Sequence, residues 1–153
     1  MKTKSFLLLS SLTLTTLFYS CSQNQEKDIK DLMVEKSTIC YQAISEKDTG
    51  WLRIDTSKSQ IIGLLTFSYG NGTNYDGQFK GKMYGDTLKG HYDFKVNKVD
   101  KWYRNPVAFL KRDGKLTMGV GKFYMYFGSA YFDDKRKIDY EKGKFIFEIT
   151  DCK

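Results

Sequence analysis

The sequence has few of the residues that most often perform catalysis. Its 153 residues include one histidine, His91, and three cysteines. A hydrolase-type triad or a cysteine–histidine pair needs a histidine that a neighbouring group orients. We expect His91 on the charged face of a β-hairpin, opposite Lys80 and near Lys82 and Lys89, where it would be a poor general base. We therefore predict that the protein is not an enzyme.

The sequence also gives little support for a metal site or a nucleotide-binding site. The cysteines have no histidine close to them in the sequence, and the acidic residues are scattered over turns and strand edges. The 13 glycines fall at strand and turn positions, with no helix following them as a phosphate-binding loop requires. We predict no metal site and no cofactor.

Charge of one sign is in excess, but the excess is small. The chain has 25 Lys and Arg residues against 18 Asp and Glu residues, and the basic residues are spread along the sequence. Nucleic-acid binding favours basic residues clustered on one face. We therefore expect no nucleic-acid partner.

Long hydrophobic runs are confined to the N-terminus. The run Phe6–Tyr19 follows Lys2 and Lys4 and is too short to span a bilayer as a mature helix. This pattern predicts a secretory signal peptide over residues 1–20. Its end resembles a bacterial lipobox, because the small Ser20 precedes Cys21. That resemblance implies acylation of Cys21 and anchoring to a membrane; the alternative is an ordinary signal peptide with an accidental cysteine.

The remaining chain divides into a tether and one domain. Residues 21–37 are polar and predict a flexible tether, with one or two helical turns as the alternative. Residues 38–153 predict a single β domain. Cys40 and Cys152 lie near its two ends and predict a disulfide in an oxidising compartment, with two free thiols as the alternative.

The stretch Gly77–Phe94 predicts a β-hairpin that turns at Gly85-Asp86. This register puts the aromatic and apolar residues, such as Phe79 and Tyr92, on one face and the charged residues on the other. Gly81 would face Gly90 on the apolar side. Two facing glycines allow a bend, or leave a hollow for a large side chain such as that of Trp51.

Alternation of apolar and polar residues predicts further strands on both sides of this hairpin. A five-residue loop, Gly70–Asn74, would place Tyr69 opposite Tyr75, and the turn Asp113-Gly114 would place Val107 opposite Val120. The predicted strands are residues 39–41 and beyond, 51–55, 60–69, 106–111, 115–124 and 144–152, with Pro106 at the start of its strand.

About eight short strands in one domain predict a small antiparallel up-and-down β-barrel, lipocalin-like in architecture. In such a barrel with an even strand number, the start of the first strand lies beside the end of the last. Cys40 and Cys152 occupy those two ends, which favours the barrel. A β-sandwich or a partly open antiparallel sheet is the alternative.

Several of these features occur together in one group of proteins. The lipobox, the polar tether, Cys40-Tyr41, the glycine-rich run through Asp86-Thr87-Leu88 and the terminal Cys152 resemble small, functionally uncharacterised lipoproteins of Bacteroidota-type bacteria. The resemblance implies a cell-envelope location, with the outer membrane as the expected anchor. Asp86-Thr87-Leu88 also resembles the acceptor for O-glycosylation in these bacteria, which implies a glycan on Thr87.

Aromatic residues are abundant, with 11 Tyr, 11 Phe and 2 Trp. Most are expected in the core, but two groups could be exposed. Trp102 and Tyr103 lie between Lys101 and Arg104, and Tyr124–Tyr131 is almost wholly aromatic or small. Aromatic rings mixed with cations suit the binding of a glycan, a peptide or an anionic ligand, whereas loop packing is the alternative.

Together these features predict a monomeric, lipid-anchored envelope protein that binds something without catalysing a reaction. Lys101, Trp102, Tyr103 and Arg104 are the predicted contact residues. The partner would be another envelope protein or a glycan. The alternative is a carrier that holds a small apolar ligand inside the barrel, since eight strands can enclose one.

Overall fold

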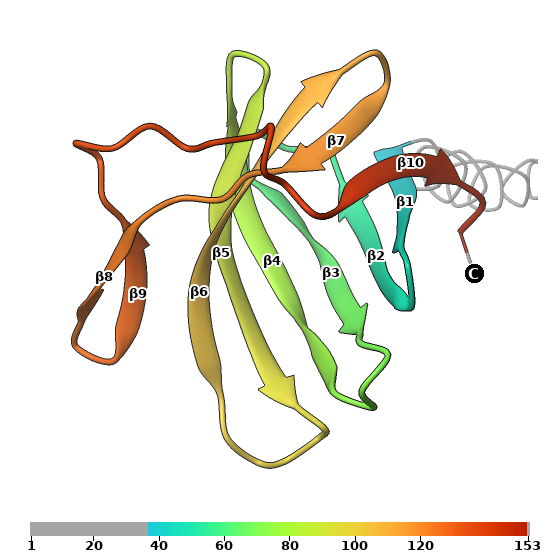
Figure 1. The fold of residues 1–153 in the computed structure, drawn as a ribbon. Helices are drawn as coiled ribbons and strands as arrows, with labels where there is room; N and C mark the ends of the chain where they lie inside the picture. Colours follow the sequence, from blue (N-terminus) through green and yellow to red (C-terminus); the bar gives the residue numbers. More distant parts are fainter. Residues whose placement is uncertain (1–36, 153) are drawn as a thin grey trace, which may run out of the picture. The chain divides into compact units, whose positions relative to one another are not determined.

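The computed structural model describes residues 37–152 (Figure 1). Every named element between these residues is a β-strand, which confirms the all-β prediction. We find no helix here that could span a membrane. The predicted signal peptide, Cys21 and most of the tether lie outside the described residues. The strands are β1 Thr38–Ser45, β2 Asp48–Asp55, β3 Ile61–Ser68, β4 Asn74–Tyr84, β5 Thr87–Val96, β6 Tyr103–Arg112, β7 Lys115–Met118, β8 Phe123–Tyr126, β9 Ser129–Phe132 and β10 Ile146–Thr150.

Eight of the strands close into an antiparallel barrel. Its order is β1-β10-β7-β6-β5-β4-β3-β2, so the predicted up-and-down barrel is confirmed. Strands β8 and β9 form a separate two-stranded hairpin, inserted between β7 and β10 (Figure 1). The disulfide joins Cys40 to Cys152 with a Cα–Cα distance of 5.2 Å. Because Cys40 pairs with Thr150 in the β1–β10 ladder, the two cysteines meet where the first and last strands close the barrel.

The central hairpin has the predicted register, with Phe79 opposite Tyr92 and Gly81 opposite Gly90. On the inner face of the hairpin, the Phe79 ring occupies the space beside Gly81. A Cβ atom on Gly81 would lie 2.5 Å from the Phe79 ring, and one on Gly90 would lie 2.2 Å from the Lys80 carbonyl oxygen. Trp51 lies elsewhere, because its neighbour Leu52 is fully buried and successive strand residues face opposite sides. The glycines therefore permit close approach of the two backbones.

The connection between β3 and β4 has the predicted length but a shifted register. Phe67, not Tyr69, lies opposite Tyr75, so the five-residue loop begins one residue earlier than expected. Parity was predicted correctly, because the shift of two residues keeps every side chain on its face. Backbone bonds within the loop fix the observed register: the Tyr69 N–H donates to the Thr73 carbonyl at 2.8 Å, and the Gly72 N–H donates to Tyr69 at 2.9 Å.

Strand β6 begins at Tyr103, so Pro106 lies inside the strand and the prediction that it begins the strand is wrong. Pro106 lies opposite His91 of β5. On the other side, β7 pairs only with β6 residues Phe109–Arg112. Pro106 is therefore at a local sheet edge, where a residue without an N–H donor is tolerated.

Strand β7 ends at Met118 instead of continuing to Tyr124. The predicted pairing of Val107 with Val120 does not form, because Val120 bridges to Asp139 in the inserted segment. Gly119 allows this turn away from the sheet, since a Cβ atom there would lie 2.3 Å from the Ile138 side chain. The last strand, β10, is shorter than the predicted residues 144–152, and its Ile149 side chain is exposed.

Large side chains fill the interior of the barrel. Phe79, Phe109 and Phe147 are almost inaccessible to solvent, and their ring centroids lie 6.0 Å (Phe79–Phe109) and 5.5 Å (Phe109–Phe147) apart. Gly50 makes room for this packing, because a Cβ atom at that position would lie 2.7 Å from the Phe147 ring. An eight-stranded barrel is narrow enough for side chains to fill it, and these rings do so.

Candidate binding groove

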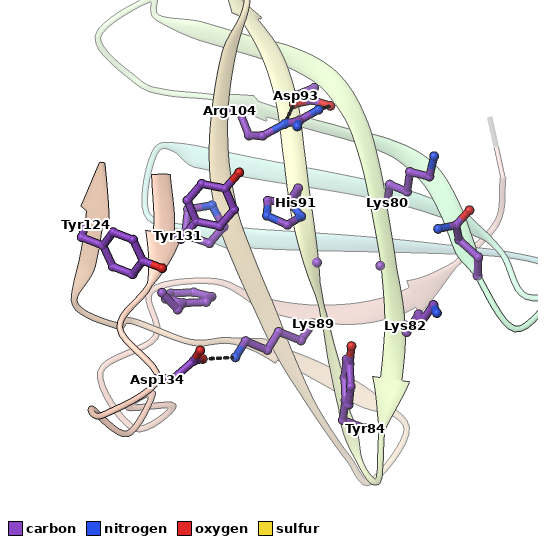
Figure 2. Close-up of a pocket in the computed structure, with 15 residues that line it drawn as sticks. Lys80, Lys82, Tyr84, Lys89, His91, Asp93, Arg104, Tyr124, Tyr131 and Asp134 are labelled. Carbon is purple, nitrogen blue, oxygen red and sulfur yellow. Dashed lines mark hydrogen bonds and ion pairs between the residues drawn. The ribbon is translucent and has the colours of Figure 1, made fainter. Parts of the chain in front are cut away.

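A groove of about 760 Å³ lies on the outer face of β4, β5 and β6, beside the β8–β9 hairpin (Figure 2). Strands β4–β6 supply its floor, and β9 and β8 supply one wall. Its lining residues are Gln60, Lys80, Gly81, Lys82, Tyr84, Lys89, Gly90, His91, Asp93, Arg104, Pro106, Tyr124, Tyr131, Phe132 and Asp134.

Strand alternation explains why the groove is polar. Phe79 and Tyr92 point into the core, so their neighbours Lys80 and His91 point outwards from the same ladder. Lys82 and Lys89 form the next outward pair. Because the apolar side chains of this hairpin face the core, its lysines face outwards and form a basic surface.

Two of the four cations of the groove are neutralised by carboxylates. Arg104 makes a bidentate bond to Asp93 across β5 and β6, with N–O distances of 2.5 and 2.7 Å. This hydrogen bond raises the pKa of Arg104. Lys89 contacts Asp134 at 3.3 Å, an ion pair that joins the sheet to the segment after β9 (Figure 2).

Lys80 and Lys82 are the remaining cations of the groove. Both are exposed, and neither has an ion pair within residues 37–152. With four cations and two carboxylates in the lining, the groove has a net charge of +2. The uncompensated charge thus lies on β4, on the side of the groove away from the hairpin (Figure 2).

His91 lies in the groove and is only partly accessible. Its ring centroid is 5.5 Å from that of Tyr131, in an edge-to-face arrangement. Burial lowers the pKa of His91, and the nearby Arg104 charge lowers it further, whereas Asp93 opposes this shift. The imidazole is therefore neutral at pH 7 and acts as part of the groove surface. In the described part of the chain, no group of three His, Cys, Asp or Glu residues is placed to hold a metal ion.

Aromatic rings form the wall opposite the lysines. Tyr131 stacks on Tyr124, with ring centroids 5.9 Å apart. Lys89 lies 5.8 Å from the centre of the Phe132 ring. Tyr84, at the end of β4, adds a further exposed ring on the lysine side (Figure 2).

The four predicted contact residues do not form one site. Arg104 lines the groove, whereas Tyr103 stacks on Phe94 with centroids 5.6 Å apart. Lys101 lies 5.1 Å from the Tyr103 ring centre. Trp102 is 57% exposed in the β5–β6 loop. Consecutive strand residues point to opposite faces, so β6 separates Tyr103 from Arg104.

Thr87 is the first residue of β5 and is partly buried. Its hydroxyl donates a hydrogen bond of 3.4 Å to the Asp86 carboxylate in the turn. The prediction of a glycan on Thr87 stays a prediction.

Lys80, Lys82, Tyr84 and Tyr131 are among the groove residues that the predicted contact set omitted. The predicted hairpin register already placed the two lysines on a shared outer face. The missing information was the position of Tyr131, because the β8–β9 hairpin returns to the β5–β6 surface through contacts distant in sequence.

No family model matches this chain, and no curated protein or solved structure shows significant similarity to it.

Proposed function

We propose that this protein is a non-enzymatic binding protein of the cell envelope, anchored by a lipid on Cys21, and that the groove binds an anionic glycan. The observation that carries the proposal is the pair of uncompensated ammonium groups, on Lys80 and Lys82, facing a wall of tyrosine rings.

Both halves of the groove suit such a ligand. Aromatic side chains offer flat apolar surfaces with a polar edge, which can cover a sugar ring. Ammonium groups attract carboxylate, phosphate or sulfate substituents, and a hydrogen bond to a charged group contributes about 1.5–3 kcal/mol. The groove has a volume of about 760 Å³, which is large enough for several sugar units.

The polar side chains on the floor of the groove already contact one another. His91 is neutral and rests against Tyr131, and the Asp93 carboxylate is engaged by Arg104. A ligand in the groove would meet these side chains as a recognition surface.

The proposal is tested by calorimetric titration of the purified protein with oligogalacturonate, an anionic oligosaccharide. Maltohexaose, a neutral oligosaccharide, is the matched probe. We expect the anionic probe to bind and the neutral probe to bind at least tenfold more weakly, since loss of about 1.4 kcal/mol corresponds to a tenfold change. Equal binding of both probes would contradict the role of the lysines.

Variants locate the binding surface. Lys80→Gln/Lys82→Gln removes the uncompensated charge and is expected to weaken binding of oligogalacturonate by about tenfold. Lys58→Gln/Lys111→Gln is the matched control, because it removes two exposed lysines that do not line the groove. If the control variant loses as much affinity as the groove variant, binding depends on overall charge and the groove is not the site.

The anchor is tested separately by mass spectrometry of protein purified from its own membrane. We expect loss of residues 1–20 and an added diacylglyceryl group on Cys21. Cys21→Ser should move the protein from the membrane fraction to the soluble fraction. An unmodified Cys21 in membrane-purified protein would refute the anchor and leave the groove proposal standing.

The carrier alternative has no structural observation in its favour. A ligand inside the barrel would have to displace the buried Phe109 ring, which packs against the rings of Phe79 and Phe147. We therefore place the ligand on the outer face.

A further inference from the structure

The β8–β9 hairpin has an exposed apolar tip, of which only Tyr124 lines the groove. Phe123, Tyr124, Met125, Tyr126 and Phe127 are each at least 53% exposed, and Phe127 at the turn is 90% exposed. Residues 123–131 contain no charged side chain. Monomeric soluble proteins scatter exposed apolar residues singly, so a contiguous group of five indicates a surface that meets something.

The turn itself is unusual. Phe127 has φ = 47°, in the left-handed region, and is followed by Gly128 with φ = 76°. Two-residue hairpin turns of this type are normally made by Asn-Gly or Gly-Gly, because side chains with a bulky Cβ substituent are strained there. The chain keeps a large apolar ring where a small polar residue would stabilise the turn better. Such an outlier is a reason to look for a function at the tip.

The surroundings of the tip indicate what it meets. Lys122 precedes β8, and Lys135, Arg136 and Lys137 follow β9; all four side chains are exposed. The Asp133 N–H donates to the Lys122 carbonyl at 2.9 Å, so these cations gather at the base of the hairpin. Asp133 and Asp134 lie there too, but Asp134 is paired with Lys89.

The geometry points to an anionic lipid surface as the partner: we propose that the hairpin tip inserts into the headgroup region of a membrane. A four-residue strand spans about 13 Å at about 3.3 Å per residue. A tip inserted by about 5–10 Å, as amphipathic segments are, would leave the basal cations at the level of the lipid phosphates. Phe, Tyr and Trp are the side chains that favour this interface.

A second aromatic site lies at the same end of the barrel. Figure 1 shows the β8–β9 turn and the β5–β6 loop pointing towards the same end, opposite the β4–β5 turn. The β5–β6 loop carries the exposed Trp102, with the Lys95 ammonium 4.9 Å from its ring centre. Two aromatic anchors, each beside cations, are what a flat anionic surface would contact. Trp102 thereby gains a role that the groove does not give it.

The experiment uses single-tryptophan reporters in the full chain, bound to vesicles of phosphatidylglycerol and phosphatidylethanolamine that contain brominated lipid. In a Trp51→Phe/Trp102→Phe background, Phe127→Trp reports on the tip. Tyr84→Trp is the matched control, because Tyr84 is an aromatic residue that is 63% exposed and ends β4, at the opposite end of the barrel. Bromine quenches tryptophan only at short range. We expect severalfold stronger quenching of the Phe127→Trp reporter than of the Tyr84→Trp reporter.

Quenching of Trp102, in the β5–β6 loop, provides a second measurement in a protein whose hairpin tip is unchanged. In the Trp51→Phe chain, Trp102 is the remaining tryptophan, and it should also be quenched more strongly than the Tyr84→Trp reporter. The strand registers place Thr38, the first residue of β1, at the same end of the barrel as Tyr84. An anchor on Cys21 would therefore not by itself bring the tip closer to the vesicle than Tyr84, so stronger quenching at the tip does not depend on acylation.

Two outcomes would overturn the proposal. Equal quenching of the Phe127→Trp and Tyr84→Trp reporters would show that the tip does not enter the lipid. A blue-shifted emission of the Phe127→Trp reporter without quenching by brominated lipid would show that protein covers the tip, either a second copy or another partner.

Discussion

Replacing Gly90 by alanine tests the close approach at the centre of the β4–β5 hairpin. The added Cβ atom would lie 2.2 Å from the Lys80 carbonyl oxygen and 2.5 Å from the Cα atom of Gly81. Both neighbours are backbone atoms, which no side-chain rotation can move. The strands would have to separate locally by roughly 1 Å to restore an ordinary contact distance.

The expected loss of stability follows from three terms. Overpacking at a tight site costs about 1–3 kcal/mol. Separation of the strands weakens the adjacent backbone hydrogen bonds, each contributing about 1 kcal/mol. Alanine also restricts the unfolded chain, which offsets about 0.4–1 kcal/mol. The net destabilisation should be about 2–3 kcal/mol, which would lower the midpoint of thermal unfolding by about 10 °C in a domain of this size.

Urea unfolding of the oxidised protein, followed by circular dichroism, measures the effect. Gly85→Asn is the matched control, because nothing lies within 4 Å of a Cβ atom there and the residue has φ = 60°, a conformation that asparagine tolerates. We expect the control to change stability by less than about 0.5 kcal/mol. If Gly90→Ala unfolds at the same urea concentration as Gly85→Asn, the backbones are not in close contact and the packing argument for the hairpin is wrong.

Three further predictions concern the disulfide, the histidine and the buried tyrosine. Cys40→Ser/Cys152→Ser should lower the free energy of unfolding by about 4–5 kcal/mol, because the disulfide closes a loop of 112 residues; a loss below about 1 kcal/mol in urea unfolding would contradict this. Arg104→Gln should raise the pKa of His91, measured by NMR titration of the single imidazole, because one positive charge leaves its surroundings while Asp93 stays; an unchanged pKa would leave burial as its sole cause. Tyr92→Phe should raise stability to urea by about 1 kcal/mol, because the buried hydroxyl has no hydrogen-bond partner within residues 37–152; a clear destabilisation would show that the hydroxyl is bonded.

The His91 shift also has a consequence for stability. Its pKa is lowered in the folded state, so between that value and the unfolded value of about 6.5 the unfolded chain binds more protons. Stability then falls as the pH decreases through this window. Because His91 is only partly buried, the effect should be small, and it should vanish in His91→Gln.

The barrel could be predicted from the sequence because alternation of apolar residues, turn residues and the two cysteines all indicate the same strand pairing. In the β4–β5 hairpin, a single turn position at Gly85-Asp86 places the apolar residues of both strands on one face, with Tyr84 as the exception. The cysteines then supplied the long-range constraint that alternation lacks, by identifying Cys40 and Cys152 as neighbours. The β3–β4 register was predicted less well, because a shift of two residues leaves the faces unchanged and only the loop hydrogen bonds choose between the two.

The groove could not be predicted in the same way. Its floor follows from the outward lysines of β4 and β5, but its wall depends on where the β8–β9 hairpin lies. The segment from Tyr124 to Tyr131 has a run of aromatic residues on both faces, so alternation does not say which face packs. Ala130 is buried, at 1% exposure, and the adjacent Tyr131 lies against His91 of β5. Nothing in the local pattern distinguishes these two neighbours.

The inserted β8–β9 hairpin is not needed to close the barrel. The barrel is therefore a scaffold that can form without the hairpin, whereas the groove wall and the lipid-binding tip both depend on it. Strands β7 and β10 pair directly through Thr117 and Ile146, and the Met118 N–H donates to the Phe145 carbonyl at 2.9 Å. A short turn after Met118 could make the same connection. The chain instead extends from Gly119 to Lys144 and keeps a strained, exposed Phe127 at its farthest point. Because Tyr131 and Phe132 of this segment also form the groove wall, one insertion would supply both the ligand contact and the lipid contact. Binding of an anionic glycan and seating of the tip on a membrane should therefore be coupled through the hairpin, while the barrel itself remains unchanged.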